Sequence, residues 1–303
     1  MEYKVRSKSK KLLIYESLAV RMVLSDEDRA VYKRLLKGYE GELAFDEMTR
    51  KLQCECIILN DLVLEIGGKT FQIDTLIITA KPIYLFEVKN FEEEYYYDSK
   101  EDQFIKLPKL VVDNPLVQLK RSETTLLQLL RQLGYTSISI HASVVFINSE
   151  FTLLQAPLDK PLILPTQLNS FLRKFNNIPS GLTDAHWQMA DKLCALHQTE
   201  TRYDQLPTYT FEDLQPGMRC RKCGALSVTV VGKKGICQCG ESEKVTDAII
   251  RQVQEFQLLF PNEKITTKII HAWCGEVFSK KRICNTLQRN FKRVGIDKLA
   301  YYE

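Results

Sequence analysis

The chain has no long apolar run, little net charge and an odd number of cysteines, and each absence excludes a class of protein. No apolar stretch among the 303 residues is long enough to span a membrane. The stretch Leu12 to Val20 follows a basic N-terminus but is interrupted by Glu16, so we do not expect a secretory signal. Nine cysteines, mostly late in the chain, favour a cytoplasmic location and a metal site over a disulfide framework.

The composition is that of a folded protein with a large core. Apolar residues make up 45% of the chain and charged residues 26%, which at this length indicates a globular protein of two or three domains. The net charge is only +4. Binding of nucleic acid would therefore depend on local basic patches rather than on the field of the whole molecule.

Three charged residues interrupt two apolar stretches near the middle of the first half. Residues 73–79 and 83–88 are rich in β-branched and aromatic side chains, which predicts two adjacent strands. Because side chains alternate along a strand, Glu87 and Lys89 project from one face, and the neighbouring strand can place Asp74 opposite them. Charges in apolar strands are costly unless they are paired or hold a metal. The pattern therefore predicts one acidic and basic cluster.

The order Asp-x12-Glu-x-Lys resembles the active-site core of PD-(D/E)XK nucleases, and two further motifs narrow the resemblance to the NERD (nuclease-related domain) family. Residues 38–42, Gly-Tyr-Glu-Gly-Glu, are similar to the family's upstream Gly-x-x-Gly-Glu motif. Residues 113–118, Asp-Asn-Pro-Leu-Val-Gln, are similar to its downstream Asn-Pro-Leu-x-Gln motif. The resemblance extends over residues 35–148 and implies a metal-dependent nuclease that acts on DNA in preference to RNA.

Phosphodiester hydrolysis requires a neutralised phosphate and a deprotonated water, and a cation held by one or two carboxylates supplies both. We expect Asp74 and Glu87 to hold Mg²⁺ or Mn²⁺, and Lys89 to orient or deprotonate the water and stabilise the developing charge. The resemblance implies that Glu42 joins the carboxylates and that Gln118 contacts the phosphate or Lys89.

Two alternatives stay open at this point. Glu42 can be an ordinary solvated helix residue, and the cluster of Asp74, Glu87 and Lys89 can be a purely structural network. In that case the protein would bind or regulate nucleic acid without cutting it, or would serve as a protein-interaction module.

The wider pattern predicts an α/β fold, a restriction-endonuclease-like mixed sheet flanked by helices, over residues 35–200. A helical N-terminal segment is expected over residues 1–34. The expected strands are residues 56–66, 71–79, 83–88 and 138–147, with a hairpin over 95–105, and the expected later helices are residues 115–133, 165–175 and 183–197.

Four cysteines predict a zinc ribbon over residues 217–244. Cys220 and Cys223 form one pair, and Cys237 and Cys239 follow as a second pair with one spacer residue. Four thiolates suit tetrahedral Zn²⁺ and leave no open coordination position, so the expected role is structural. Unrelated buried thiols, the alternative, would rarely fall in this order.

Residues 245–303 predict a basic module that resembles a helix-turn-helix unit with part of a wing. Residues 278–293, which include most of its second helix, carry six basic side chains and no acid: Lys280, Lys281, Arg282, Arg289, Lys292 and Arg293. These residues are candidates for binding nucleic acid; the alternative is a packing helix with a basic solvent face, or a surface for a protein partner. Cys274, Cys284 and His271 lack a second chelating pair, so we expect them to be core or turn residues.

Overall fold

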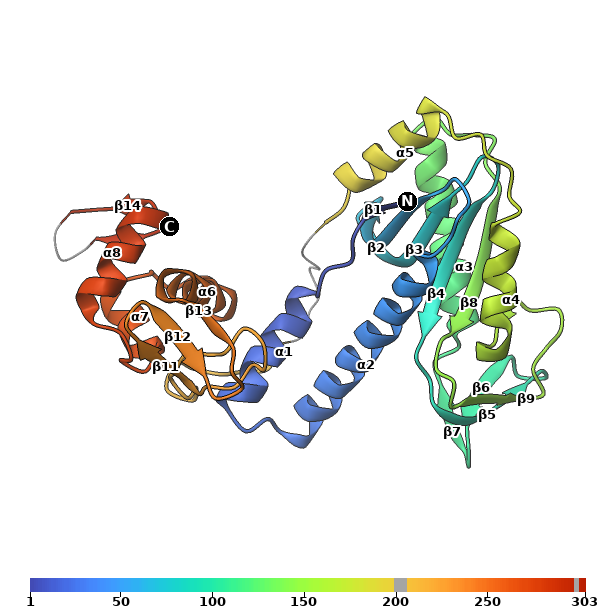
Figure 1. Ribbon diagram of the computed structural model, residues 1–303. Coiled ribbons are helices and arrows are strands. Elements are labelled where there is room, and N and C mark those ends of the chain that lie inside the picture. Colours follow the sequence, from blue (N-terminus) through green and yellow to red (C-terminus); the bar gives the residue numbers. More distant parts are fainter. Residues whose placement is uncertain (199–205, 297–299) are drawn as a thin grey trace. The chain divides into compact units, whose positions relative to one another are not determined.

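The computed structural model describes residues 1–198, 206–296 and 300–303 (Figure 1). The chain forms two compact units. The first comprises Met1–Lys8 and Lys33–Tyr203, and the second comprises Ser9–Tyr32 and Asp204–Glu303. The described residues contain eight helices, none of them long and apolar enough to cross a membrane.

A six-stranded mixed sheet forms the centre of the first unit, in the order β1-β2-β3-β4-β8-β10. Its strands are β1 (Glu2–Lys4), β2 (Ile57–Ile66), β3 (Lys69–Ile78), β4 (Ile83–Lys89), β8 (Ile140–Phe146) and β10 (Leu162–Ile163). Strands β2, β3 and β4 pair antiparallel, whereas β1, β8 and β10 pair parallel to their neighbours. The predicted α/β fold with a mixed sheet is confirmed.

Helices cover both faces of this sheet. One core is formed with α2 (Asp26–Thr49) and α4 (Pro165–Phe175), and it includes Phe45 and Phe86. The core on the other face is formed with α3 (Pro115–Gln132) and α5 (Asp184–Ala195), and it includes Leu85. Since alternate residues of β4 enter opposite cores, Glu87 lies on the face of Leu85, which α3 covers.

A second, four-stranded sheet packs into the core on the α3 side. Its strands are β5 (Glu93–Asp98), β6 (Gln103–Lys106), β7 (Leu110–Val112) and β9 (Phe151–Leu154), in the order β7-β6-β5-β9. Strands β5 and β6 form the expected hairpin. The aromatic rings of Phe146, on β8, and Phe151, on β9, stack with centroids 4.2 Å apart, which joins the two sheets.

The N-terminal segment differs from the helical one predicted over residues 1–34. Helix α1 (Lys10–Arg21) and the start of α2 fall within it, but β1 is an edge strand of the sheet. Polar contacts fix this strand: the N-terminal amine donates to Cys56 O at 2.6 Å, and Lys4 Nζ donates to Asn60 O at 2.8 Å. Residues 1–5 alternate apolar and polar, but the apolar Tyr3 and Val5 are exposed. The strand therefore turns no apolar face to the core, so its role at the sheet edge could not be predicted from its pattern.

The second unit combines a three-stranded sheet with helices. Its remaining elements are β11 (Val228–Val231), β12 (Lys234–Cys237), β13 (Ser242–Lys244), α6 (Val245–Leu259), α7 (Thr267–Trp273), α8 (Lys280–Asn290), β14 (Arg293–Val294) and β15 (Tyr301–Tyr302). Helices α7 and α8 follow one another in the expected order, but α8 ends at Asn290 and not at residue 294 as expected. Arg293–Val294 instead forms β14, which pairs antiparallel with β15. A short last strand was expected over residues 298–302, of which residues 298 and 299 lie outside the described residues.

A buried arginine connects α1 to the C-terminal helices of this unit. The Arg21 guanidinium lies 3.7 Å from the ring centroid of Trp273, on α7, and donates to Glu255 Oε2, on α6, at 2.8 Å. It also donates to Gln215 O at 2.9 Å. Helix α1 therefore packs with the C-terminal helices, a relation that the sequence pattern did not predict.

Candidate active site and metal centre

The strand register brings Asp74 opposite Glu87. The antiparallel ladder of β3 and β4 pairs Thr75 with Phe86, and the next step along both strands is Asp74 and Glu87. Asp74 Oδ2 accepts a hydrogen bond from Val88 N at 2.7 Å, which fixes the carboxylate at the end of the ladder. Both carboxylates are buried, with 6% of Asp74 and 2% of Glu87 exposed.

Lys89 lies between Glu87 and the helix that covers this face. Its Nζ donates to Glu87 Oε1 at 2.7 Å and to Gln118 Oε1 at 3.0 Å. Gln118 is placed there by the start of α3, where Asn114 caps the helix through its side chain and Pro115 occupies the first turn. The Asn-Pro-Leu-Val-Gln motif thus aims one amide at the Lys89 ammonium.

Arg6 connects Glu42 to this group. Its Nη1 lies 2.5 Å from Glu42 Oε2, and its Nη2 donates to Asp74 O at 2.7 Å. Two further hydrogen bonds, of 2.8 and 3.0 Å, join the guanidinium to the carboxylate of Asp46. Arg6 is buried, so the first unit contains an internal cation for the carboxylates of α2.

Sequence reasoning missed both Arg6 and Asp46. Arg6 belongs to a basic N-terminal run that has the composition of a solvated tail. Asp46 follows Glu42 by four residues, so the two carboxylates occupy one face of α2, and this spacing was the available signal.

The glycine before Glu42 sets how closely α2 approaches β4. A Cβ on Gly41 would lie 2.5 Å from Asn90 Cβ, a distance that side chains do not tolerate, whereas a Cβ on Gly38 would meet nothing within 4 Å. Asn90 is itself fixed, since its Nδ2 donates to Lys37 O at 2.7 Å. Gly41 therefore permits the close contact of α2 with Asn90, and Glu42 beside it directs its carboxylate to the site.

Burial and mutual repulsion raise the pKa values of the carboxylates. Burial, and then the negative charge of Asp74, raise the pKa of Glu42 and of Glu87 to about 8. Burial also raises the pKa of Asp74, against the opposing effect of Lys89. Burial by itself would lower the pKa of Lys89, but the charges of Glu87 and Asp74 outweigh it and the pKa is raised. Lys89 is therefore a cation at neutral pH.

The carboxylate oxygens of the site are ligands that suit a hard divalent cation, although three of them do not lie close together. Within the part of the chain that the structure describes, only the four late cysteines bring three or more ligand atoms of Cys, His, Asp or Glu within 4.8 Å of one another. Asp74 and Glu87 offer two carboxylates, and Mg²⁺ is commonly held by one or two carboxylates with waters completing its shell. These residues fit such an ion.

Residues 37–147 match the family model described as nuclease-related domain, NERD. This part of the chain is a NERD domain. Its range contains the five predicted site residues, which are Glu42, Asp74, Glu87, Lys89 and Gln118. Arg6 lies outside the matched range, as do the four late cysteines. Comparison with curated proteins found no similar sequence, and comparison with solved structures found no similar fold.

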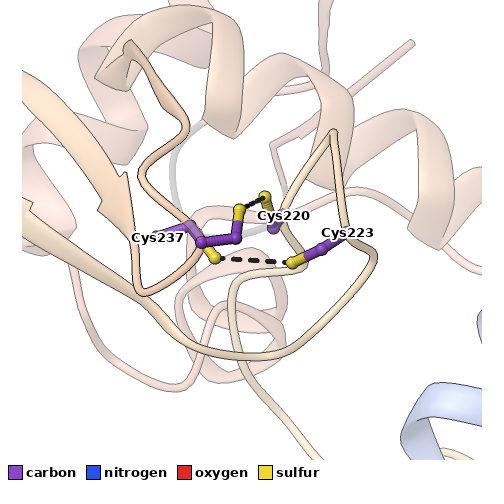
Figure 2. A group of neighbouring side chains, drawn as sticks. Cys220, Cys223 and Cys237 are labelled. Atoms are coloured by element: carbon purple, nitrogen blue, oxygen red, sulfur yellow. Dashed lines mark hydrogen bonds between the residues drawn. The ribbon is translucent and has the colours of Figure 1, made fainter.

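Beyond the NERD domain, the four predicted cysteines converge in the second unit, where Figure 2 shows Cys220, Cys223 and Cys237. The Sγ atoms of Cys220 and Cys239 lie 3.7 Å apart, and those of Cys223 and Cys237 lie 3.6 Å apart. A tetrahedral zinc site with Zn–S bonds of about 2.3 Å has sulfurs about 3.8 Å apart. The spacing fits a metal site with four cysteine ligands.

The glycines after each cysteine pair shape the loops around the sulfurs. Gly224 and Gly240 have φ angles of +76° and +86°, in the region that favours glycine. Gly224 N donates to Cys220 O at 3.1 Å, and Gly240 N donates to Cys237 O at 3.0 Å. Each loop thus closes by a backbone hydrogen bond from its glycine to the first cysteine of the pair, over four residues in the first loop and three in the second. The cluster fits the predicted zinc ribbon.

The predicted basic residues lie on α8 and just after it. Lys280, Lys281, Arg289, Lys292 and Arg293 are exposed, and Arg282 is half-buried. The opposite face of α8 packs inward through Ile283 and Leu287. These cations belong to the second unit, whereas the carboxylates of the NERD domain belong to the first.

Proposed function

We propose that the NERD domain is a Mg²⁺- or Mn²⁺-dependent nuclease that hydrolyses phosphodiester bonds in DNA. A nuclease-related domain implies a nucleic-acid substrate. The observation that carries the proposal is the position of Lys89 Nζ, between Glu87 Oε1 and Gln118 Oε1, on the strand face that also bears Asp74. Cation, carboxylates and amide therefore meet at one end of β4.

Asp74 and Glu87 would hold the metal ion, which would neutralise phosphate charge and acidify a bound water. Lys89, protonated in this setting, stabilises negative charge that develops on the phosphate. Gln118 restrains the Lys89 ammonium by accepting its hydrogen bond. Glu42, held by Arg6, would join these carboxylates near Asp74 once it releases its proton.

A second candidate function is nucleic-acid binding without cleavage. It is favoured by Arg6, which already neutralises Glu42 and Asp46 and so satisfies part of the cluster without a metal. A buried ion-pair network of this kind can be purely structural.

Plasmid cleavage separates these two functions. The full chain is incubated with supercoiled DNA and with single-stranded RNA, with and without added Mg²⁺ or Mn²⁺. Chelators are left out because they would also attack the cysteine cluster. Cleavage of DNA that requires the added ion supports the nuclease, whereas intact DNA that is still bound supports the second function.

We also propose that Cys220, Cys223, Cys237 and Cys239 bind one structural Zn²⁺. The near-tetrahedral sulfur spacing supports this assignment. With four protein ligands the ion would have no position for substrate, so it would stabilise the ribbon rather than take part in cleavage.

A further inference from the structure

A polar hollow of about 320 Å³ lies between α8 and the first turn of α6. Its basic side chains are Lys281, Arg282 and Arg289, from one face of α8, and Thr246 and Asn285 add a hydroxyl and an amide. No acidic residue lines it. The hollow therefore offers hydrogen-bond donors and positive charge to an anion.

The cations of α8 differ from three arginines elsewhere in the same unit. Arg219, Arg221 and Arg251 each form an ion pair with a glutamate. Lys281, Arg282 and Arg289 form none with any described residue. Their charge is thus not neutralised within the described part of the fold, so it is left for a partner.

The polar face of α8 is unsuited to a membrane. An interfacial helix needs an exposed apolar face to insert between lipids. In α8 that face, with Ile283 and Leu287, is buried in the unit's own core. The exposed side instead carries the amides of Asn285 and Gln288 among the cations. Amides of this kind are suited to hydrogen bonding with base edges.

We propose that α8 binds duplex DNA in the major groove, with a backbone phosphate in the hollow at Lys281, Arg282 and Arg289. The order of α7, a turn, α8 and the β14–β15 hairpin matches that of helix-turn-helix units, whose second helix enters this groove. The major groove of B-form DNA admits a helix, whereas that of A-form RNA is too narrow. This DNA site is separate from the proposed cleavage site.

Fluorescence anisotropy of the full chain with a labelled 20-base-pair DNA tests the site. Divalent ions are omitted, so binding is read without cleavage and independently of the proposed nuclease. In Lys281→Ala/Arg289→Ala we expect affinity to fall about tenfold or more, and the slope of log affinity against log salt to fall by about one, for the phosphate in the hollow that the variant no longer neutralises. Lys281→Gln/Arg289→Gln, which keeps side-chain length, should show the same decrease.

The matched control is Lys233→Ala/Lys234→Ala, which removes the same charge from the exposed turn between β11 and β12. It should bind almost as the parent does. An equal decrease in both double variants would overturn the proposal, because binding would then follow net charge rather than the α8 hollow. Unchanged binding in the α8 variants, or equal affinity for duplex RNA of the same sequence, would overturn it as well.

Discussion

Arg6 Nη1 lies 2.5 Å from Glu42 Oε2, and this ion pair joins a residue outside the matched NERD range to the Gly-Glu motif inside it. Arg6 also holds Asp46 through two hydrogen bonds and donates to the backbone oxygen of Asp74. One guanidinium thus spans helix α2 and strand β3. The N-terminal segment is therefore part of the site's framework.

Replacing this arginine should destabilise the first unit strongly. Arg6→Ala leaves Asp46 and Glu42 without their cation, and breaking a buried pair in this way costs about 3–5 kcal/mol. Arg50→Ala is the control, since Arg50 pairs with Glu2 at an exposed position and should cost less than about 1 kcal/mol. Urea unfolding followed by far-ultraviolet circular dichroism measures both, and similar destabilisation in the two variants would contradict the role given to Arg6.

The two glycines of the α2 motif should respond oppositely to alanine. Gly41→Ala places a Cβ against Asn90 and should destabilise the fold by about 1–3 kcal/mol, as overpacking usually does. Gly38→Ala meets open space within a helix and should stabilise it by up to about 1 kcal/mol. Thermal melts of both variants check the pair. A higher melting temperature in both variants would show that α2 does not approach β4 as closely as described.

Without added Mg²⁺ or Mn²⁺, the stability of the protein should fall as pH rises from about 4.5 to 8. Over this window folded Glu42 and Glu87, with pKa raised to about 8, keep protons that the unfolded chain releases above its ordinary value of 4.5. Since the folded state binds more protons, the free energy of unfolding decreases with pH.

The neutral amide of Glu87→Gln removes one of these titrations, so its stability should depend less steeply on pH. Glu94→Gln, at an exposed position on β5, should follow the parent. Added Mg²⁺ should raise the melting temperature of the parent more at pH 8.5 than at pH 6, because protons compete with metal for the carboxylates. If the melting temperature changed with pH equally in the parent, Glu87→Gln and Glu94→Gln, the raised pKa assigned to Glu87 would be wrong.

Replacement of one ribbon cysteine should release zinc without unfolding the NERD domain. Elemental analysis of the parent should find one Zn²⁺ per chain, and Cys223→Ser should lose it and expose residues 218–244 to protease, because metal binding contributes folding free energy. Cys54→Ser removes a thiol outside the cluster and should keep the metal. Zinc-free parent protein, purified without chelators, would count against the site.

The sequence was informative where the signal is local. The strands around Asp74 and Glu87 are apolar runs with a clear break, and Pro115 marks the start of α3, so these elements and the face shared by Glu87 and Lys89 could be predicted. The four cysteines have a spacing that few other structures require, and they do converge.

What could not be predicted depends on partners distant in sequence. Arg6 has the appearance of a tail residue until β1 pairs with β2, more than fifty positions away. Arg21 likewise acquires its role from Glu255 and Trp273, which only the tertiary fold brings beside it. The need for glycine at position 41 also follows from a close approach across the fold, to Asn90.

The rate of Mg²⁺-dependent plasmid cleavage in Lys89→Ala, set against the parent and Lys106→Ala, tests the central claim most directly. Lys106 also pairs with a glutamate, Glu93, but lies on β6, away from the carboxylate pair. We expect the parent and Lys106→Ala to cleave at similar rates. Lys89→Ala should cleave at least about 100-fold more slowly, because it lacks the ammonium that stabilises the transition state. Cleavage by Lys89→Ala at the parent rate would contradict the assigned active site.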